Sequence, residues 1–422
     1  MADENTVSED LDSFRQRARE WLAANMSRVG PAGQPAGYSD ASVARARILQ
    51  GKLFEGGFAG LCFPREHGGQ GLSPAHQRVF NEECAAYEMP AVLNICHLTI
   101  LAPTLLDFGT EEQKQRYLPA ILRGEELWIQ FLSEPTGGSD LAGVITRATP
   151  DADGWLLSGS KIWSTGADVS DYALCLARTD WDAPKHRGLT MFVVKIHQPG
   201  ITVERIKQVN GSMEFCQEFF DDVRIPPENV VGQVNDGWSV ASRLLLHERN
   251  SIGGATSFAS GPRRGRSSDG AQRDLVELAK GTGQADDQGV RQLVAEAHVL
   301  GAVQGHLLQR VGAGMGTGHF PGTAGAILKL YGATTGIRRS DIGLEIAGTA
   351  GVAWNEDRWM AGQYGQQYLS KQSGGLAGGS NEMQRNIISE RVLGMPREFA
   401  ADRDRPFGEV KHNRMPVRAV ER

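Results

Sequence analysis

The stretch LWIQFLSEPTGGSD, from Leu127 to Asp140, decides the fold because the texture of the sequence changes there. Before it, apolar residues recur at three- and four-residue steps, as they do on one face of a helix. After it, short apolar runs alternate with Gly, Pro and Asp turns: WLLSGSKIW (155–163), YALCLAR (172–178), LTMFVVKI (189–196) and QEFFDDVRI (217–225). Several short strands at close spacing, with no helix between them, predict an antiparallel barrel or sandwich.

Working outward from this zone, the helical period returns at about residue 237. The sequence therefore predicts an α+β protein of several domains. We expect an N-terminal helical domain at 1–125, a middle β-barrel domain at 126–236, a C-terminal helical bundle at 237–398 and a polar tail, extended or disordered, at 399–422. Within the bundle, residues 321–350 and 381–393 read as helices, whereas 259–290 reads as irregular.

Composition narrows the class of protein. A net charge of −6 is mild and argues against general affinity for nucleic acid. The acidic start MADENTVSED lacks the pattern of a signal or transit peptide, and no apolar run approaches the length of a membrane span. Five scattered cysteines without metal-ligand spacing indicate reduced thiols and no metal site. These features predict a cytoplasmic protein.

Four blocks of this sequence resemble the acyl-CoA dehydrogenase family in order and spacing. They are GFAGLCFPREHGGQG (57–71), FLSEPTGGSD (131–140), SGSKIWST (158–165) and GGSNEMQRNIISERVLG (378–394). The resemblance covers about residues 8–398. It implies a C-terminal four-helix bundle, an FAD cofactor, an acyl-CoA substrate, a role in β-oxidation of fatty acids or other lipids, and an electron-transferring flavoprotein as electron acceptor.

The resemblance also implies which residues bind the flavin. Small residues after a strand let backbone N–H groups approach a ligand closely, and an indole can cover one face of a flat ring. A helix N-terminus preceded by glycines suits polar or anionic ligand atoms. The implied flavin-binding residues are Gln130, Leu132, Ser133, Gly138, Ser139, Trp163, Ser164, Thr165, Gly379, Ser380, Asn381 and Glu382, together with Glu345 and Gly348 for the adenine of a neighbour's flavin. Lys161 is expected to be structural.

The catalytic base needs a separate argument. Removal of an α-proton from an acyl thioester requires a desolvated carboxylate, because desolvation raises the pKa of a carboxyl group and makes it a stronger base. Many family members carry that glutamate at the start of the last block, where this sequence has Gly378. Either the base is lost, or it is Glu248 in LLLHERN (244–250), which matches the subset that includes isovaleryl-CoA and long-chain dehydrogenases. The vacant position at Gly378 favours Glu248. By resemblance, Ser139, Arg249 and Gly378 contact the acyl-CoA.

One family motif is missing. In typical members, the helix that contains the residue equivalent to Glu248 is followed by Arg-x-x-Phe-Gly, whose arginine reaches the flavin of the adjacent subunit. This sequence lacks the motif; Arg263, Arg264 and Arg266 lie in the same region but in another register. A homo-oligomer, dimer or tetramer, and a hetero-oligomer with a related chain are therefore both open. So are two alternatives to the dehydrogenase: a non-catalytic or half-site subunit, and an oxidase or monooxygenase of the same fold.

Overall fold

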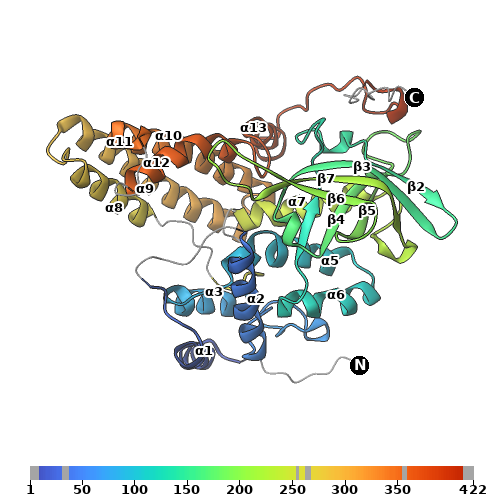
Figure 1. The fold of residues 1–422 in the computed structure, drawn as a ribbon, viewed down its shortest axis with the longest axis horizontal. Coiled ribbons are helices and arrows are strands. Elements are labelled where there is room, and N and C mark those ends of the chain that lie inside the picture. Colours follow the sequence, from blue (N-terminus) through green and yellow to red (C-terminus); the bar gives the residue numbers. More distant parts are fainter. Residues whose placement is uncertain (1–8, 31–37, 253–255, 262–267, 354–358, 412–422) are drawn as a thin grey trace.

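The computed structural model describes residues 9–30, 38–252, 256–261, 268–353 and 359–411, which form three parts in the predicted order (Figure 1). In Figure 1 the N-terminal helices lie below the β domain and the C-terminal helices extend to its left. The fold class is thus confirmed: an N-terminal helical part, a central β domain and a C-terminal helical part.

The N-terminal part consists of helices around their own core. They are α1 (Leu11–Asn25), α2 (Asp40–Glu55), α3 (Pro74–Glu83), the single turn α4 (Ala91–Leu93), a π-helical segment (Asn94–Leu101), α5 (Ala102–Phe108) and α6 (Glu111–Arg123). Local sequence sets the ends of α6: Thr110 and Gln113 form a reciprocal capping box, and Gly124 ends the helix with a φ of 74°. The β domain begins four residues later.

The β domain is one strongly coiled sheet, with β1 (Trp128–Phe131), β2 (Arg147–Asp151), β3 (Gly154–Thr165), β4 (Tyr172–Arg178), β5 (Leu189–Lys195), β6 (Ile201–Ile206), β7 (Phe215–Ile225) and β8 (Val230–Val231). Its order is β6-β7-β3-β2-β4-β5-β8, and β1 pairs with β4. Pairing is antiparallel, as predicted, except that β1 and β2 each run parallel to β4. β2 and β6 were not predicted, because Pro150 and the charges of these strands interrupt an apolar pattern.

Helix α7 (Gly237–Ile252) joins the three parts. Its residues Val240, Ala241 and Leu244 belong to a core that also contains residues of α5, α6, β4 and β5. Polar contacts fix it further: His247 Nε2 lies 2.9 Å from Asp107 Oδ2 on α5, and the hydroxyls of Ser251 and Thr99 lie 2.7 Å apart. α7 is therefore held rigidly where the β domain meets the C-terminal helices.

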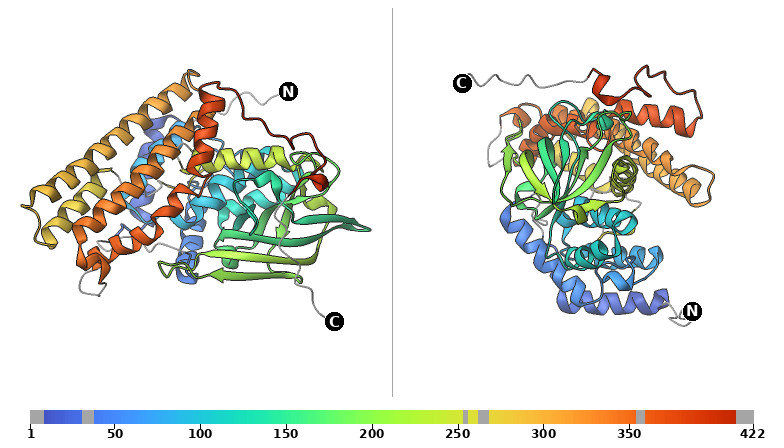
Figure 2. Two further views of the ribbon diagram at one scale, coloured as in Figure 1. Left: turned by 90° about the horizontal axis from the view of Figure 1, so that it is seen from above. Right: turned by 90° about the vertical axis from the view of Figure 1, so that its right-hand side faces the viewer.

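The C-terminal part contains α8 (Ser268–Gly281), α9 (Gln288–Gly316), α10 (Gly325–Ala347), the short α11 (Thr349–Val352), α12 (Trp359–Ser370) and α13 (Asn381–Ile387), which continues as a π-helical turn (Ile388–Val392). α8, α9, α10 and α12 lie side by side (Figure 2) around a shared apolar core. Two helices depart from expectation: α8 occupies the stretch 259–290 that reads as irregular, and α12 was not predicted. The apolar face of α8 is short (Leu275, Leu278 and Ala279), and α12 is diluted by glycine and glutamine.

The tail departs from its predicted extended form over the part that the structure describes. After residue 399 the chain runs along the β domain and forms a single turn, Phe407–Glu409. Phe407 is only 1% exposed. Its ring lies 3.6 Å from the Arg178 guanidinium and 5.5 Å from the ring of Trp181. One aromatic residue in a polar segment is enough to dock it.

Candidate active site

Glu248 on α7 faces the first strand of the β domain. The side-chain amide of Gln130, on β1, donates a hydrogen bond of 3.1 Å to Glu248 Oε2. Burial raises the pKa of Glu248, while the Gln130 hydrogen bond and the charges of Arg249 and Lys329 act in the opposite direction. A carboxylate with a raised pKa is the environment that a general base needs. The structure thus brings together Gln130, Glu248 and Arg249, three residues that the sequence proposed.

Gly378 lies directly beside this carboxylate, although 130 positions separate it from Glu248 in the sequence. Its φ of +69° favours glycine, and a Cβ added there would lie 3.5 Å from Glu248 Oε1 and 2.6 Å from Ile252 Cδ1. A longer side chain at 378 would therefore collide with α7. Position 378 and position 248 border the same point in space, and a side chain at 378 would require Ile252 to shift.

Lys329 on α10 is a site residue that the sequence analysis missed. Its Nζ donates a hydrogen bond of 2.7 Å to the carbonyl of Gly374, and its Cε lies 3.5 Å from the position of a Cβ at Gly378. Burial lowers the pKa of Lys329, and the charge of Glu248 counteracts this effect. The available signal was a single lysine in the apolar helical run AILKLYG (326–332). Lys329 thus places a cation behind the carboxylate.

The resemblance predicts three segments that bind the flavin, which we call the flavin segments. The first of them is a tight turn after β1. Glu134 and Gly137 exchange backbone hydrogen bonds of 3.1 and 2.9 Å, which leaves Gly138 and Ser139 exposed beyond the turn. Leu132 is buried beneath it, and Ser133 Oγ lies 3.0 Å from where a Cβ on Gly138 would be. A side chain at 138 would therefore crowd Ser133.

A buried ion pair anchors this turn. Lys161 Nζ donates to Glu134 Oε1 (2.9 Å) and to the carbonyl of Leu132 (3.0 Å), and the backbone N–H groups of Ile145 and Thr146 donate to the same carboxylate. Burial acts to raise the pKa of Glu134, but the Lys161 charge and these hydrogen bonds outweigh it and lower the pKa. Lys161 therefore has the structural role expected from the sequence.

The second flavin segment is a bulge at the end of β3. Trp163 has a φ of +68°, rare for a bulky residue, and its indole is 55% exposed, edge-on to Phe215. Ser164 turns inward instead: its hydroxyl is buried and donates a hydrogen bond of 3.0 Å to Glu218. Its side chain is thus directed away from the face that Trp163 presents. Ser164 and Thr165 are the two hydroxyl residues of this segment. Thr165 is only partly buried, so its hydroxyl is the one that can reach a ligand on the face of Trp163.

The last flavin segment precedes α13. Ser380 caps this helix by accepting a hydrogen bond from the N–H of Met383, as the sequence predicts. Gln384 Nε2 donates to the carbonyls of Gly378 and Gly379, at 3.2 and 3.0 Å. Asn381 and Glu382 lie in the first turn of the helix, where backbone N–H groups have no partner within the helical ladder.

Two predicted residues are not brought to this site. Glu345 and Gly348 lie at the end of α10, while Lys329, near its beginning, borders Glu248. Glu345 forms an ion pair of 3.7 Å with Arg338 and is half exposed. In Figures 1 and 2 this end of the bundle points away from the β domain. Arg263, Arg264 and Arg266 lie outside the described residues.

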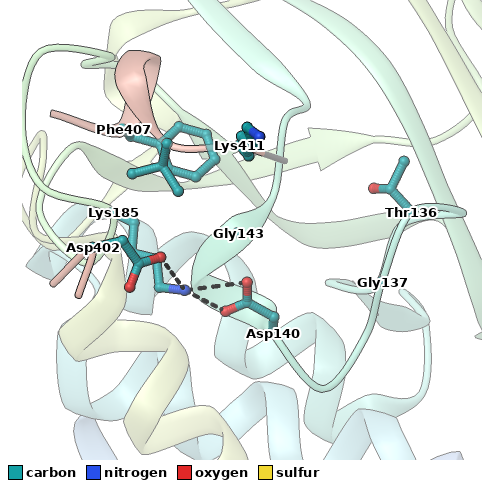
Figure 3. A pocket seen from close by; sticks show the side chains of 9 residues that line it. Thr136, Gly137, Asp140, Gly143, Lys185, Asp402, Phe407 and Lys411 are labelled. Carbon is teal, nitrogen blue, oxygen red and sulfur yellow. Dashed lines mark hydrogen bonds and ion pairs between the residues drawn. The ribbon is translucent and has the colours of Figure 1, made fainter. Parts of the chain in front are cut away.

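A cavity of about 190 Å³ lies on the outer side of the flavin turn (Figure 3). Thr136, Gly137, Asp140 and Gly143 line one side, and Lys185 lines the other with Asp402, Phe407, Val410 and Lys411. Lys185 Nζ pairs with Asp140 at 3.0 Å and with Asp402 at 3.9 Å. The cavity does not include Glu248; it shows instead that the tail is tethered to the flavin turn.

Several features fit a flat, polar cofactor. Gln130 Oε1 and Asn381 Oδ1 are buried, and neither has a hydrogen-bond partner among the described residues. A buried polar atom without a partner is costly and calls for a ligand or water. The exposed Trp163 offers the face of a flat ring. The three-part fold, with a buried carboxylate of raised pKa where its parts meet, is typical of a class of oxidoreductases.

Comparison with known proteins gives the family. Models of the acyl-CoA dehydrogenase N-terminal, middle and C-terminal domains match residues 8–125, 130–223 and 235–393. The chain is 35% identical over 408 residues to the acyl-CoA dehydrogenase IpdE1 of Mycobacterium tuberculosis, covering 92% of this chain and 99% of that protein. It belongs to the acyl-CoA dehydrogenase family and is an acyl-CoA dehydrogenase, an oxidoreductase.

Solved structures extend this comparison. The structure described as the Tcur3481-Tcur3483 steroid ACAD matches with a TM-score of 0.74 at 28% identity, over 92% of this chain and 98% of that one. A chain of the ChsE4-ChsE5 complex from Mycobacterium tuberculosis matches with a TM-score of 0.70 at 26% identity, over 93% and 100%. These homologues form complexes of two unlike chains. Members of the family typically depend on FAD. No helix within the described ranges is both long and apolar enough to cross a membrane.

Proposed function

We propose that this chain binds FAD and catalyses the α,β-dehydrogenation of an acyl-CoA thioester to the trans-2-enoyl-CoA, with Glu248 as the base. The observation that carries the proposal is the hydrogen bond from Gln130 to Glu248. It joins the strand that leads into the first flavin segment to a carboxylate with a raised pKa. The proposed base is therefore adjacent to a segment proposed to bind the flavin. Removal of hydrogens from two adjacent carbons requires the base and the hydride acceptor to lie close together.

Each residue then has a defined task. Gln130 holds Oε2 of Glu248, which leaves Oε1 directed toward Gly378 and free to accept the α-proton. Burial disfavours the ionised carboxylate and so strengthens it as a base, while Arg249 and Lys329 keep part of the population ionised. FAD, when bound, supplies the acceptor for the hydride that leaves the β-carbon. Arg249, partly buried next to the base, is proposed to bind the CoA portion.

The cofactor is proposed to be held by the three segments described above. The groups that fit it are the unpaired amide oxygens of Gln130 and Asn381, the exposed indole of Trp163 and the exposed Gly138. Glu345 and Gly348 are proposed to serve a neighbouring subunit, because they lie at the far end of α10. An electron-transferring flavoprotein is the proposed acceptor of the electrons.

We propose a bulky acyl group, such as a steroid side chain, as the substrate class. Because Gly378 has no side chain, only backbone atoms of this residue line the space beside Glu248. Leu376, two residues earlier, is 67% exposed. A homologue described as a steroid ACAD supports the same class. A hetero-oligomer with a related chain is proposed as the working form, because the Arg-x-x-Phe-Gly motif is missing from the sequence and homologues form such complexes.

The test is anaerobic mixing of the purified protein with straight-chain, branched and steroid-side-chain acyl-CoAs while flavin absorbance is followed. We expect bleaching by the bulky thioesters in wild type and none in Glu248→Gln, with flavin still bound. Glu277→Gln, an exposed glutamate on α8 that pairs with Lys280, is the control and should bleach normally. Full activity of Glu248→Gln would remove Glu248 from the mechanism.

The other outcomes identify the alternatives. Protein that takes up no flavin until a related chain is added would be the half-site subunit. Rapid peroxide formation in air would indicate an oxidase. The missing arginine motif is the specific feature that favours the half-site alternative over the oxidase.

A further inference from the structure

The interior of the β domain holds a second carboxyl group that the proposed reaction does not use. Glu218 on β7 is completely buried. Its Oε2 accepts the hydrogen bond of 3.0 Å from the hydroxyl of Ser164, and its Oε1 has no partner among the described residues. A buried acid that lacks a partner for one oxygen is unfavourable when ionised, so it needs an explanation.

The charged and titratable groups around Glu218 come from three strands. Lys161 stands directly opposite on β3, but its ammonium donates to Glu134 and to the carbonyl of Leu132. Two cysteines, Cys216 on β7 and Cys175 on β4, also feel the charge of Glu218. Because Glu134 already balances Lys161, Glu218 has no cation of its own.

Ser164 connects this acid to the flavin-facing surface. The register between β3 and β7 shifts between Ile162 and Ser164, and Trp163 is the extra residue of this bulge. A bulge with a left-handed φ at a tryptophan persists only where its surroundings fix it. The Ser164–Glu218 hydrogen bond is the side-chain contact that fixes the residue next to it from within the barrel.

We propose that Ser164 and Glu218 form a buried positioning pair that holds the Trp163 bulge, with Glu218 uncharged in the resting protein. The pair sets the direction of the Trp163 indole and of the adjoining Thr165. Ionisation of Glu218 changes that direction. This inference rests on the proposed flavin binding for its purpose, but not for its geometry. Ser164 and Glu218 touch no reacting atom; they act through Trp163.

The pH at which the pair changes follows from its surroundings. Burial raises the pKa of Glu218 to about 8, while the Ser164 hydrogen bond and the Lys161 charge limit the rise. The carboxyl is therefore mainly protonated at pH 7 and ionises as the pH increases through about 8. Removing the Ser164 hydroxyl takes away a donor to the ionised form, so it moves the change to higher pH.

The experiment measures the fluorescence emission of Trp163 as a function of pH. The full chain is titrated from pH 6 to 9.5, and the emission of Trp163 is obtained as the difference between each protein and the same protein carrying Trp163→Phe. We expect a transition near pH 8 in wild type. It should disappear in Glu218→Gln, which keeps the shape of the side chain and the hydrogen bond but cannot ionise, and move up by about one pH unit in Ser164→Ala.

A matched control lies on the same two strands. Ser158 Oγ donates to Asp222 Oδ1 at 2.5 Å, again from β3 to β7, but at an exposed place away from Trp163. Asp222→Asn should leave the transition unchanged. The proposal is overturned if wild type shows no transition, if Glu218→Gln titrates like wild type, or if Asp222→Asn abolishes the transition. Glu248→Gln should keep the transition and lose flavin reduction, so this inference and the proposed base fail separately.

Discussion

Glu248 and Glu218 are two carboxyl groups whose pKa burial raises, in two different parts of the molecule. Glu248 lies at the junction of α7, β1 and α10, where an amide and two cations oppose the effect of burial. Glu218 lies inside one domain with a single hydroxyl bonded to it. The difference shows that burial alone does not distinguish a base from a structural acid. Glu248, the proposed base, has one donor and two nearby cations that favour its ionised form, and its Oε1 lies beside Gly378, which has no side chain.

The largest expected effect is on the rate of flavin reduction, and it distinguishes Glu248 from Glu218. Glu248→Gln should slow flavin reduction by acyl-CoA by about 10³-fold or more, since general-base catalysis contributes on that order. Single-turnover absorbance measurements check the rate. Glu218→Gln in the same assay should slow it far less; equal losses in both variants would mean that the two acids do not differ in role.

The next effect concerns the ion pair that isolates Glu218. Glu134→Gln leaves the buried Lys161 without its anion, so we expect a loss of roughly 3–5 kcal/mol in the free energy of unfolding. Lys161 would then turn its charge to Glu218 and lower the pKa of that carboxyl below about 8. Denaturant unfolding and the Trp163 titration measure the two consequences. Adding Lys161→Met should restore much of the stability; if it does not, Glu134 stabilises the turn through its backbone contacts alone.

Gly378→Ala tests the crowded side of the base. The new methyl group would lie 2.6 Å from Ile252 Cδ1 at a φ of +69°, so we expect a cost of about 1–3 kcal/mol in unfolding free energy. Gly374→Ala, nearby and with open space around its Cβ, is the matched control. A Gly378→Ala protein as stable as wild type would show that α7 can move away, and that position 378 is not closed to larger side chains.

The smallest effect is a shift in pH dependence. The Lys329 charge favours ionised Glu248, so Lys329→Met should raise the pKa of Glu248 further and move the rise of the reduction rate to higher pH, by up to about one unit. Below that pKa the rate falls, because less base is ionised. Lys329→Arg keeps the charge and should keep the profile. Identical pH profiles for the Met and Arg variants would exclude an electrostatic role for Lys329.

Much of the fold could be predicted because its elements carry their own signals. The apolar runs of β1, β3, β4, β5 and β7 are visible in the sequence, and Ser380, as an N-cap residue, predicts the start of α13. α8 and α12 could not be found this way, since tertiary packing stabilises them more than their own pattern does. Glu248, Gly378 and Gln130 came from the resemblance, and the structure placed them together; their catalytic roles remain a prediction.

The direction of Ser164 illustrates what sequence patterns cannot supply. Strict alternation from the inward-facing Lys161 would turn residue 163 inward and residue 164 outward. The bulge at Trp163 reverses this order, so that the indole faces out and the hydroxyl faces in. A bulge depends on long-range strand pairing, and no residue between 158 and 165 reveals it. Lys329 was missed for a related reason: its partners come from segments distant in sequence.

The crowding at Gly378 also bears on how such an enzyme can change in evolution. The carboxylate of Glu248, the methyl group of Ile252 and the backbone of Gly378 occupy one small volume. A glutamate installed at 378 would meet Ile252 on α7 while Glu248, the proposed base, was still present. A move of the proposed base from α7 to the loop at 378 would therefore involve residue 252 as well as residues 248 and 378.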